Sequence, residues 1–185
     1  MLPQSGTSQP KFVGLGQYQI ATTTPDSLNK TDFSEGGQTY VKGTLALECP
    51  HIRTFLAAKT IVEDIAITNL VLCFFDEKLF AISCDYSDAL QNMFQKQYGL
   101  GTHKKTMNHQ LCSQPGSESM ALWGEFWQNA DIMAFAIHAK GITNDCTYRA
   151  TNSLIIISQT MSALSSECNL QEQLPFAETF TKTIK

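Results

Sequence analysis

One stretch in the middle of the chain decides the fold: Leu70-Val71-Leu72-Cys73-Phe74-Phe75-Asp76-Glu77-Lys78-Leu79-Phe80-Ala81-Ile82-Ser83-Cys84. Two apolar, aromatic-rich runs flank the polar pair Asp76-Glu77, and this arrangement predicts a β-hairpin with a tight turn. The continuous apolar run from Leu70 to Phe75 is typical of a central strand that is covered on both faces. The β-rich run extends from residue 60 to residue 75, and we expect residues 62–75 to pair antiparallel with residues 78–84.

A helix is predicted directly after this hairpin. Either Asp85 or Ser87 can cap its N-terminus, and Gly99 stands where a residue of positive φ would end it. Four apolar residues fall on one face of the predicted helix: Leu90, Met93, Phe94 and Tyr98.

The segments on either side of this centre are predicted to be mainly strands. Downstream, short turn-rich connections predict an antiparallel meander of strands at residues 104–113, 119–127, 132–140 and 146–158. Upstream, the pattern predicts a first strand at residues 11–21, a short helix beginning at Thr24, a second strand at 39–49 and a helical connection at 51–59.

Composition is typical of a folded globular domain. Of 185 residues, 43% are hydrophobic and only 16% are charged, against a usual charged share of about 25%. We therefore predict an α+β fold, an antiparallel sheet of seven or eight strands with two or three short helices packed on it. The predicted organisation is a flexible N-terminal segment (residues 1–10), a single domain (11–158) and a polar C-terminal tail (159–185) that is partly ordered on the surface.

Three segments carry a resemblance to other proteins. They are the hairpin from Phe74 to Ile82 with its helix ending Lys96-Gln97-Tyr98-Gly99, the stretch from Tyr18 to Leu28, and Trp127-Gln128-Asn129-Ala130-Asp131-Ile132. Together they resemble a pattern in uncharacterised small bacterial envelope proteins, periplasmic or lipoprotein-like, of α+β fold. In that pattern the helix ends Lys-Tyr-Gly, whereas here Gln97 separates Lys96 from Tyr98. The resemblance implies a fold and a compartment and carries no catalytic residue.

The six cysteines point to an oxidising compartment. They form an even set without a C-x-x-C pair, which predicts one to three disulfides of open connectivity. With a two- or four-residue hairpin turn, Cys73 would face Phe80 and Cys84 would face Asn69, so these two cysteines should not bond each other. We expect Cys73 to be a reduced core residue.

The predicted location is periplasmic or secreted, with a cytoplasmic location as the alternative. The first ten residues, MLPQSGTSQP, resemble the polar stretch that follows a signal or lipoprotein cleavage site, which would allow a lipid anchor; an ordinary cytosolic N-terminus is the other interpretation. The longest apolar runs are far shorter than the roughly 20 residues of a membrane span. The net charge of −4 carries no electrostatic signature of nucleic-acid binding.

Several residue sets could in principle carry chemistry. Cys49-Pro50-His51 with His109-Gln110-Leu111-Cys112 offers zinc ligands but lacks the spacing of a known site. A cysteine nucleophile could use His51, His103, His109 or His138 as its base, yet no local signature supports one. The four acids Glu118, Glu125, Asp131 and Asp145 have no fixed spacing. Gly14-Leu15-Gly16 lacks the third glycine of a nucleotide loop. We therefore predict no catalytic residue, no metal site and no cofactor.

Candidate binding residues lie at the end of the predicted strand 119–127: Trp123, Phe126, Trp127 and Asp131. Neighbouring side chains of a strand alternate between faces, so Phe126 and Trp127 cannot both be buried on one face, and an exposed aromatic is expected here. Such an aromatic would anchor a sugar or a peptide. If Trp127 is this anchor, Trp127→Ala should weaken partner binding by more than about 1 kcal/mol without unfolding the domain.

The predicted function is that of a non-enzymatic envelope or secreted protein that recognises a macromolecular partner, either a protein or a cell-surface glycan. Two alternatives stay open: a small hydrolase that uses a Cys/His or carboxylate pair, and an immunity or inhibitor protein. A nucleic-acid partner and a membrane span are not expected, and the oligomeric state is left open.

Overall fold

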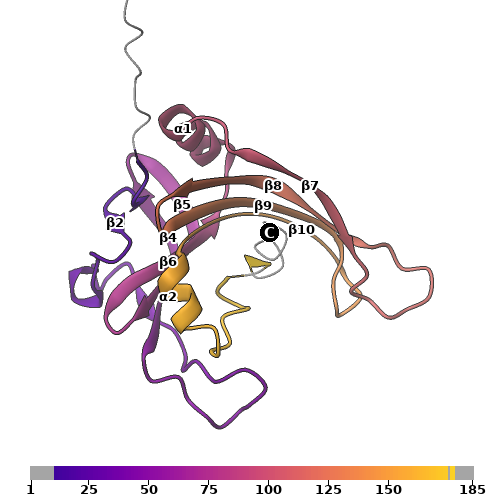
Figure 1. Cartoon of the computed structure of the whole chain (residues 1–185), viewed down its shortest axis with the longest axis horizontal. Coiled ribbons are helices and arrows are strands. Elements are labelled where there is room, and N and C mark those ends of the chain that lie inside the picture. The colour runs from indigo at the N-terminus through magenta and orange to yellow at the C-terminus, as the bar shows by residue number, and fades with distance from the viewer. Residues whose placement is uncertain (1–10, 175, 178–185) are drawn as a thin grey trace, which may run out of the picture.

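The computed structural model describes residues 11–174 and 176–177. Its centre is an eight-stranded antiparallel sheet in the order β3-β4-β5-β6-β10-β9-β8-β7, beside a small two-stranded sheet of β1 and β2 (Figure 1). The strands are β1 (Gly14–Leu15), β2 (Tyr18–Gln19), β3 (Ser34–Glu35), β4 (Ile52–Val62), β5 (Ile65–Phe75), β6 (Lys78–Asp85), β7 (Thr102–His109), β8 (Met120–Asn129), β9 (Ile132–Ile142) and β10 (Tyr148–Ser158). The helices are α1 (Asp88–Tyr98) and α2 (Gln159–Leu164), with one 3-10 turn, η1 (Pro25–Ser27).

The predicted antiparallel sheet is confirmed, but helix is scarcer than the α+β prediction implies. The described residues form a mainly β structure in which α1 has 11 residues and α2 only 6. The sheet joins two four-stranded meanders, β3 to β6 and β7 to β10, and α1 connects them along the chain. Strand β10 pairs with β6, so the last strand of the second meander joins the two meanders into one sheet. In Figure 1, strands β7 to β10 form an arched arm, with α1 above it and residues 165–174, which follow α2, beneath it.

The central hairpin is confirmed, although its register differs from the expected one. Asp76 and Glu77 form the turn between β5 and β6 and both have positive φ, as hairpin turns of this length require. Cys73 pairs with Ala81 instead of Phe80, because a bulge between Cys73 and Phe74 shifts the ladder by one residue. The predicted register is therefore wrong.

Several upstream predictions are also wrong. Residues 60–75 are not one strand, because Glu63 and Asp64 turn the chain between β4 and β5. The predicted helical connection at 51–59 lies in β4, which pairs with β5 over almost its whole length. The predicted strand at 39–49 makes only two isolated bridges, Tyr40 to Glu48 and Val41 to Cys168. These segments were predicted from local sequence patterns, whereas strand formation depends on backbone hydrogen bonds to strands elsewhere in the chain.

The helix after the hairpin is confirmed at both ends. The Ser87 hydroxyl accepts a hydrogen bond from the Leu90 N–H at 3.3 Å, and Gly99 adopts φ 79° at the C-cap. The helix buries Leu90 and Phe94 against the sheet. These contacts hold α1 over the convex side of the arm, near the middle of the sheet.

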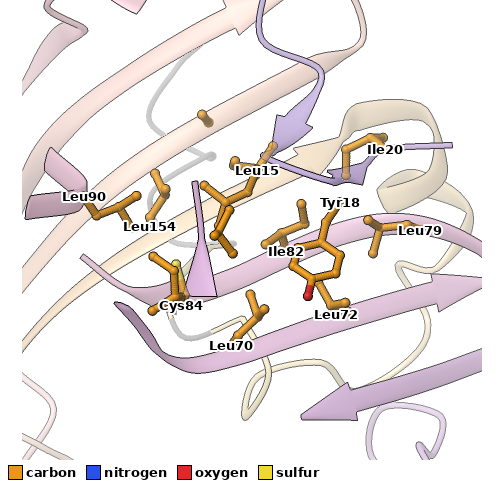
Figure 2. Close-up of a cluster of buried hydrophobic side chains, with 14 of the residues drawn as sticks. Leu15, Tyr18, Ile20, Leu70, Leu72, Leu79, Ile82, Cys84, Leu90 and Leu154 are labelled. Atoms are coloured by element: carbon orange, nitrogen blue, oxygen red, sulfur yellow. The ribbon is translucent and has the colours of Figure 1, made fainter. Parts of the chain in front are cut away.

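Apolar side chains cover the sheet on both faces. The convex-face core combines the N-terminal segment, α1 and alternate sheet residues; Figure 2 shows Leu15, Tyr18 and Ile20 lying over Leu72, Leu79 and Ile82. The concave-face core contains the other set of sheet residues, including Leu122, Phe135 and Ile137, and also Leu174 and Ala177 from beyond α2. Residues 1–10, 175 and 178–185 lie outside the described residues, and the predicted division of the chain into segment, domain and tail stays a prediction.

Two disulfides are present, as the even cysteine count predicted. Cys49 bonds Cys168 and Cys112 bonds Cys146, while Cys73 and Cys84 are reduced and buried. The expectations that Cys73 is a reduced core residue and that it does not bond Cys84 are both confirmed. Burial raises the pKa of the Cys73 thiol to about 12, and burial with the nearby Asp85 carboxylate raises that of Cys84 to about 12.

Thiol titration checks this assignment. Protein denatured without reductant should show two reactive thiols per chain, from Cys73 and Cys84. The native protein should show none at neutral pH, because both thiols are buried and protonated. Six reactive thiols after denaturation without reductant would contradict both disulfides.

Candidate functional site

Part of the arm's convex face is left uncovered by α1 and by the N-terminal segment. The strand register places Trp123 beside His138 and His138 beside Asn152 across β8, β9 and β10. The neighbouring row carries the small residues Ala121 and Ala150 on either side of an exposed lysine, Lys140. Tyr148, 54% exposed, continues this face toward the end of the arm. We call the set Ala121, Trp123, His138, Lys140, Tyr148, Ala150 and Asn152 the convex patch.

The centre of the convex patch is an aromatic stack. The Trp123 and His138 rings are nearly parallel, at an interplanar angle of 16° and a centroid distance of 5.5 Å. The Nδ1 atom of His138 lies 2.8 Å from the Asn152 side-chain oxygen, which fixes the orientation of the imidazole. Both rings are half-buried, so they are rigid groups that still reach solvent. Rigid aromatic groups of this kind lose little entropy on binding.

Two polar side chains, Tyr86 and Glu125, lie beside this stack. The Tyr86 ring is 6.4 Å from that of His138, and its hydroxyl is buried without a hydrogen-bond partner among the described residues. Burial raises the pKa of this hydroxyl, and the Glu125 carboxylate raises it further, so Tyr86 is neutral at physiological pH. Glu125 accepts long hydrogen bonds of 3.4 Å from the Gln95 amide and the Gly101 N–H, which link it to the end of α1.

The predicted binding residues do not gather at one place. Trp127 is buried at 7% exposure under α1, where its indole N–H donates to the Gly99 carbonyl at 3.0 Å. Its ring meets Phe94 edge-on at 5.0 Å. Phe126 points to the opposite face, half-buried against the concave-face core. Trp127 is therefore not an exposed anchor, because α1 folds back over this end of β8. Trp123 is the predicted residue that lies in the convex patch.

Asp131 lies in the turn between β8 and β9, where it has a local structural role. Its carboxylate accepts hydrogen bonds from the Ser158 hydroxyl and from the N–H and hydroxyl of Thr160, at the start of α2. Burial alone would raise the Asp131 pKa, but these hydrogen bonds outweigh burial and lower it. The carboxylate therefore ties the β8–β9 turn to the first turn of α2.

Replacing this carboxylate should affect stability and acid resistance. Asp131→Ala is expected to lower the free energy of unfolding at pH 7 by about 1 kcal/mol, since it leaves the N–H and hydroxyl of Thr160 without their acceptor. The Asp131 pKa is lower in the folded protein than in the unfolded chain. The stability that this carboxylate contributes is therefore fully present above its unfolded-state pKa, and it is lost as the pH falls through its folded-state pKa. Urea unfolding at pH 7 and at acid pH measures both effects; an equal difference at both pH values would contradict the assignment.

The other candidate sets are dispersed. Cys49 and Cys112 are both in disulfides, and the imidazole of His51 pairs with Asp76 at 2.7 Å. The Asp145 carboxylate accepts hydrogen bonds from Thr143 and Thr147, which lower its pKa to about 2. Within residues 11–174 and 176–177, no three histidine, cysteine or acidic side chains gather as ligands for a metal ion.

Two open hollows lie in the other half of the molecule. One of about 440 Å³ lies between the N-terminal segment and β4, and one of about 280 Å³ lies beside Arg53. Arg53 is held by ion pairs to Glu35 at 2.7 Å and Glu77 at 2.9 Å. Neither hollow contains a residue of the convex patch or of the predicted binding set.

Sequence reasoning missed most members of the convex patch. The sequence points to His138 only as a candidate catalytic base, and it does not single out Tyr148 or Asn152 as site residues. Their shared face follows from the register of β8, β9 and β10, which is read only after the strands are paired. The alternation of apolar and polar residues in Ile137-His138-Ala139-Lys140 is the sequence signal that places His138 and Lys140 on one face of a strand.

Comparison of the chain with known protein families, with curated proteins and with solved structures finds no match. Among the described residues, no helix has the length and apolar character needed to cross a membrane.

Proposed function

We propose that this protein is an exported binding protein that recognises a macromolecular partner through its convex patch. The proposal depends chiefly on the Trp123–His138 stack, which is held rigid by Asn152 and flanked by small residues on a sheet face that neither α1 nor the N-terminal segment covers. Binding surfaces are enriched in tryptophan and tyrosine because these side chains add a large contact area at low entropic cost.

A protein partner fits the convex patch better than a glycan. The patch is a sheet face bearing small residues, and neither of the two hollows lies on it. A surface without a hollow suits contact with another protein, whereas a small ligand is usually enclosed in a concave site. The same arrangement would serve an immunity or inhibitor protein, whose partner is a toxin or an enzyme.

The hydrolase alternative has less support. Four of the six cysteines are in disulfides, and the other two thiols are buried and protonated at neutral pH. A nucleophilic cysteine needs the opposite conditions, a lowered pKa and access to substrate. The acids Glu125, Asp131 and Asp145 each accept hydrogen bonds from a different part of the chain.

Site-specific crosslinking tests this proposal. A photo-crosslinking amino acid is placed at Ala150 in the convex patch and, as a matched control, at Leu45, which is 94% exposed on a different loop. Exposure to an envelope extract of the native host should give a discrete protein adduct only from position 150. Adducts of equal yield from both positions would contradict the proposed surface, and a carbohydrate adduct would favour the glycan alternative.

The purified partner then allows a quantitative test. Trp123→Ala should weaken binding at least fivefold, a loss of more than about 1 kcal/mol, since it removes the central ring of the patch. Leu45→Ala should leave the affinity unchanged. Equal affinities of wild-type protein and Trp123→Ala, measured by calorimetry on folded samples, would contradict the proposal.

A further inference from the structure

The end of the convex patch that adjoins α1 carries an incompletely paired carboxylate (Figure 1). Glu125 lies two residues beyond Trp123 on β8, so the two side chains share the convex face of the sheet. Its hydrogen bonds from Gln95 and from the Gly101 N–H are both long, at 3.4 Å, and both reach Oε2. Among the described residues, Glu125 forms no ion pair and its Oε1 accepts no hydrogen bond. This half-buried carboxylate therefore keeps one oxygen available for a donor from outside the chain.

A buried hydroxyl without a partner lies beside this carboxylate. Tyr86 is only 4% exposed, and its hydroxyl forms no hydrogen bond with the described residues. The hydroxyl is close enough to Glu125 for the carboxylate to raise its pKa, and the Tyr86 ring lies 6.4 Å from that of His138. Native proteins rarely leave a buried hydroxyl unpaired, because burial removes its hydrogen bonds to water. An unpaired hydroxyl next to an unpaired carboxylate oxygen points to a ligand that supplies N–H donors to both.

The half-buried indole of Trp123 completes this arrangement. His138 stacks on one face of the indole, and no ring or guanidinium of the described residues stacks on the other. Side chains two residues apart on a strand are about 7 Å apart, a spacing that one long side chain spans. An indole face attracts a cation, and a carboxylate attracts the same charge directly. We call Trp123, Tyr86 and Glu125 the acidic corner.

The cations nearest to the acidic corner in the sheet do not neutralise it. His103 stands opposite Glu125 on β7, but the ion pairs of the described residues do not join the two. Lys140 lies beyond the Trp123–His138 row, on the side away from Glu125. A cation from a partner would therefore be attracted to the carboxylate at one end of the convex patch and repelled by Lys140 at the other.

We propose that the partner inserts an arginine side chain into the acidic corner, with its aliphatic stem over Trp123 and its guanidinium between Glu125 and Tyr86. The planar guanidinium carries several N–H donors in a fixed arrangement, so it can bond Oε1 of Glu125 and the Tyr86 hydroxyl together. The ammonium group of lysine is a compact point charge and stacks less well on an aromatic ring. The Tyr86 hydroxyl is buried in the free protein, so a small shift of the half-buried Glu125 and Trp123 side chains accompanies binding. This inference rests on the proposed function and adds the chemistry of the partner.

Titration with N-acetyl-arginine amide tests the acidic corner without the partner. The readout is the NMR signal of the indole N–H of Trp123, and the buried indole N–H of Trp127 is the internal reference. We expect a saturable shift of the Trp123 signal and at most a minor shift of the Trp127 signal. N-acetyl-citrulline amide keeps the shape of arginine but lacks its charge, so it should bind about fivefold more weakly. Equal binding of both compounds, or no saturable shift with either, would overturn the proposal.

Three variants assign the contacts within the acidic corner. Glu125→Gln preserves side-chain size and should weaken binding of the arginine compound about fivefold, with binding of the citrulline compound unchanged. The matched control is Glu118→Gln, at an exposed acid in the loop before β8, and it should bind like the wild type. Tyr86→Phe should bind the arginine compound about threefold more weakly and keep its thermal stability, because the hydroxyl has no partner in the free protein. Unchanged affinity in Glu125→Gln or in Tyr86→Phe would overturn the placement of the guanidinium.

A test with the partner separates failure of this inference from failure of the proposed function. For a partner captured through position 150, Glu125→Gln should lower the affinity about tenfold. A crosslink from position 150 with equal affinities of wild-type protein and Glu125→Gln would overturn the arginine contact and leave the convex patch as the binding surface. If position 150 gives no crosslink, the proposed function fails, and the titration with N-acetyl-arginine amide still decides whether the acidic corner binds a guanidinium.

Discussion

Removal of the Cys49–Cys168 disulfide is expected to lower the free energy of unfolding by about 4 kcal/mol. The bond joins residues separated by 119 positions, so it restricts the unfolded chain over most of its length. The stabilisation grows with the logarithm of the loop closed, which places this bond near the upper end of the usual range. The measurement is urea unfolding of Cys49→Ala/Cys168→Ala without reductant, compared with the wild-type protein.

The second disulfide offers the matched comparison. Cys112 and Cys146 are separated by only 34 positions, so Cys112→Ala/Cys146→Ala should cost about 1 kcal/mol less than the first pair. Its loss should chiefly loosen the connections at the end of the arm. A smaller loss of stability from Cys49→Ala/Cys168→Ala than from Cys112→Ala/Cys146→Ala would contradict the idea that the Cys49–Cys168 bond stabilises the protein by constraining the unfolded chain.

Trp127→Ala is expected to destabilise the protein by about 3 to 5 kcal/mol. The indole is buried between β8 and α1, and its removal leaves a cavity under Phe94. It also leaves the Gly99 carbonyl without its hydrogen-bond donor. The loss is a large part of the total stability of a domain of this size. Thermal unfolding followed by circular dichroism measures it, and the near-ultraviolet signal reports whether α1 still packs on the sheet.

Two substitutions distinguish packing from hydrogen bonding at this position. Trp127→Phe keeps an aromatic ring against Phe94 but loses the N–H donor, so it should cost clearly less than the alanine variant. Trp123→Ala, on the same strand face but half-buried, should also be milder. A Trp127→Ala protein as stable as the wild type would show that α1 does not depend on this contact.

Elements with strong local signals were predictable from the sequence. The turn at Asp76-Glu77 follows from a polar pair between two apolar runs, and α1 follows from a serine cap, one apolar face and a terminal glycine. The four downstream strands were expected near β7, β8, β9 and β10, because turn-forming residues separate them. In each case the residues that form the element are close neighbours in the chain.

The candidate site depended far more on tertiary structure. Trp123 was singled out by its type, but its partner His138 comes from another strand, and the choice between Trp123 and Trp127 as the accessible ring was made by α1. The sequence also left the disulfide pairing open, since six cysteines allow many pairings. The pairing depends on which loops the fold brings together, as the contact of Cys168 with the loop at Val41 illustrates.

The amino-acid sequence by itself determined the antiparallel β character, the central hairpin turn, both ends of α1 and the reduced state of Cys73. Tertiary structure alone decided that residues 52–62 form β4 and not a helix, that a bulge shifts the β5–β6 register, and that Trp127 is buried. The reason is physical: turns and caps are satisfied by hydrogen bonds between neighbouring residues, whereas a strand's backbone groups and a large ring's surface are satisfied only by partners distant in sequence.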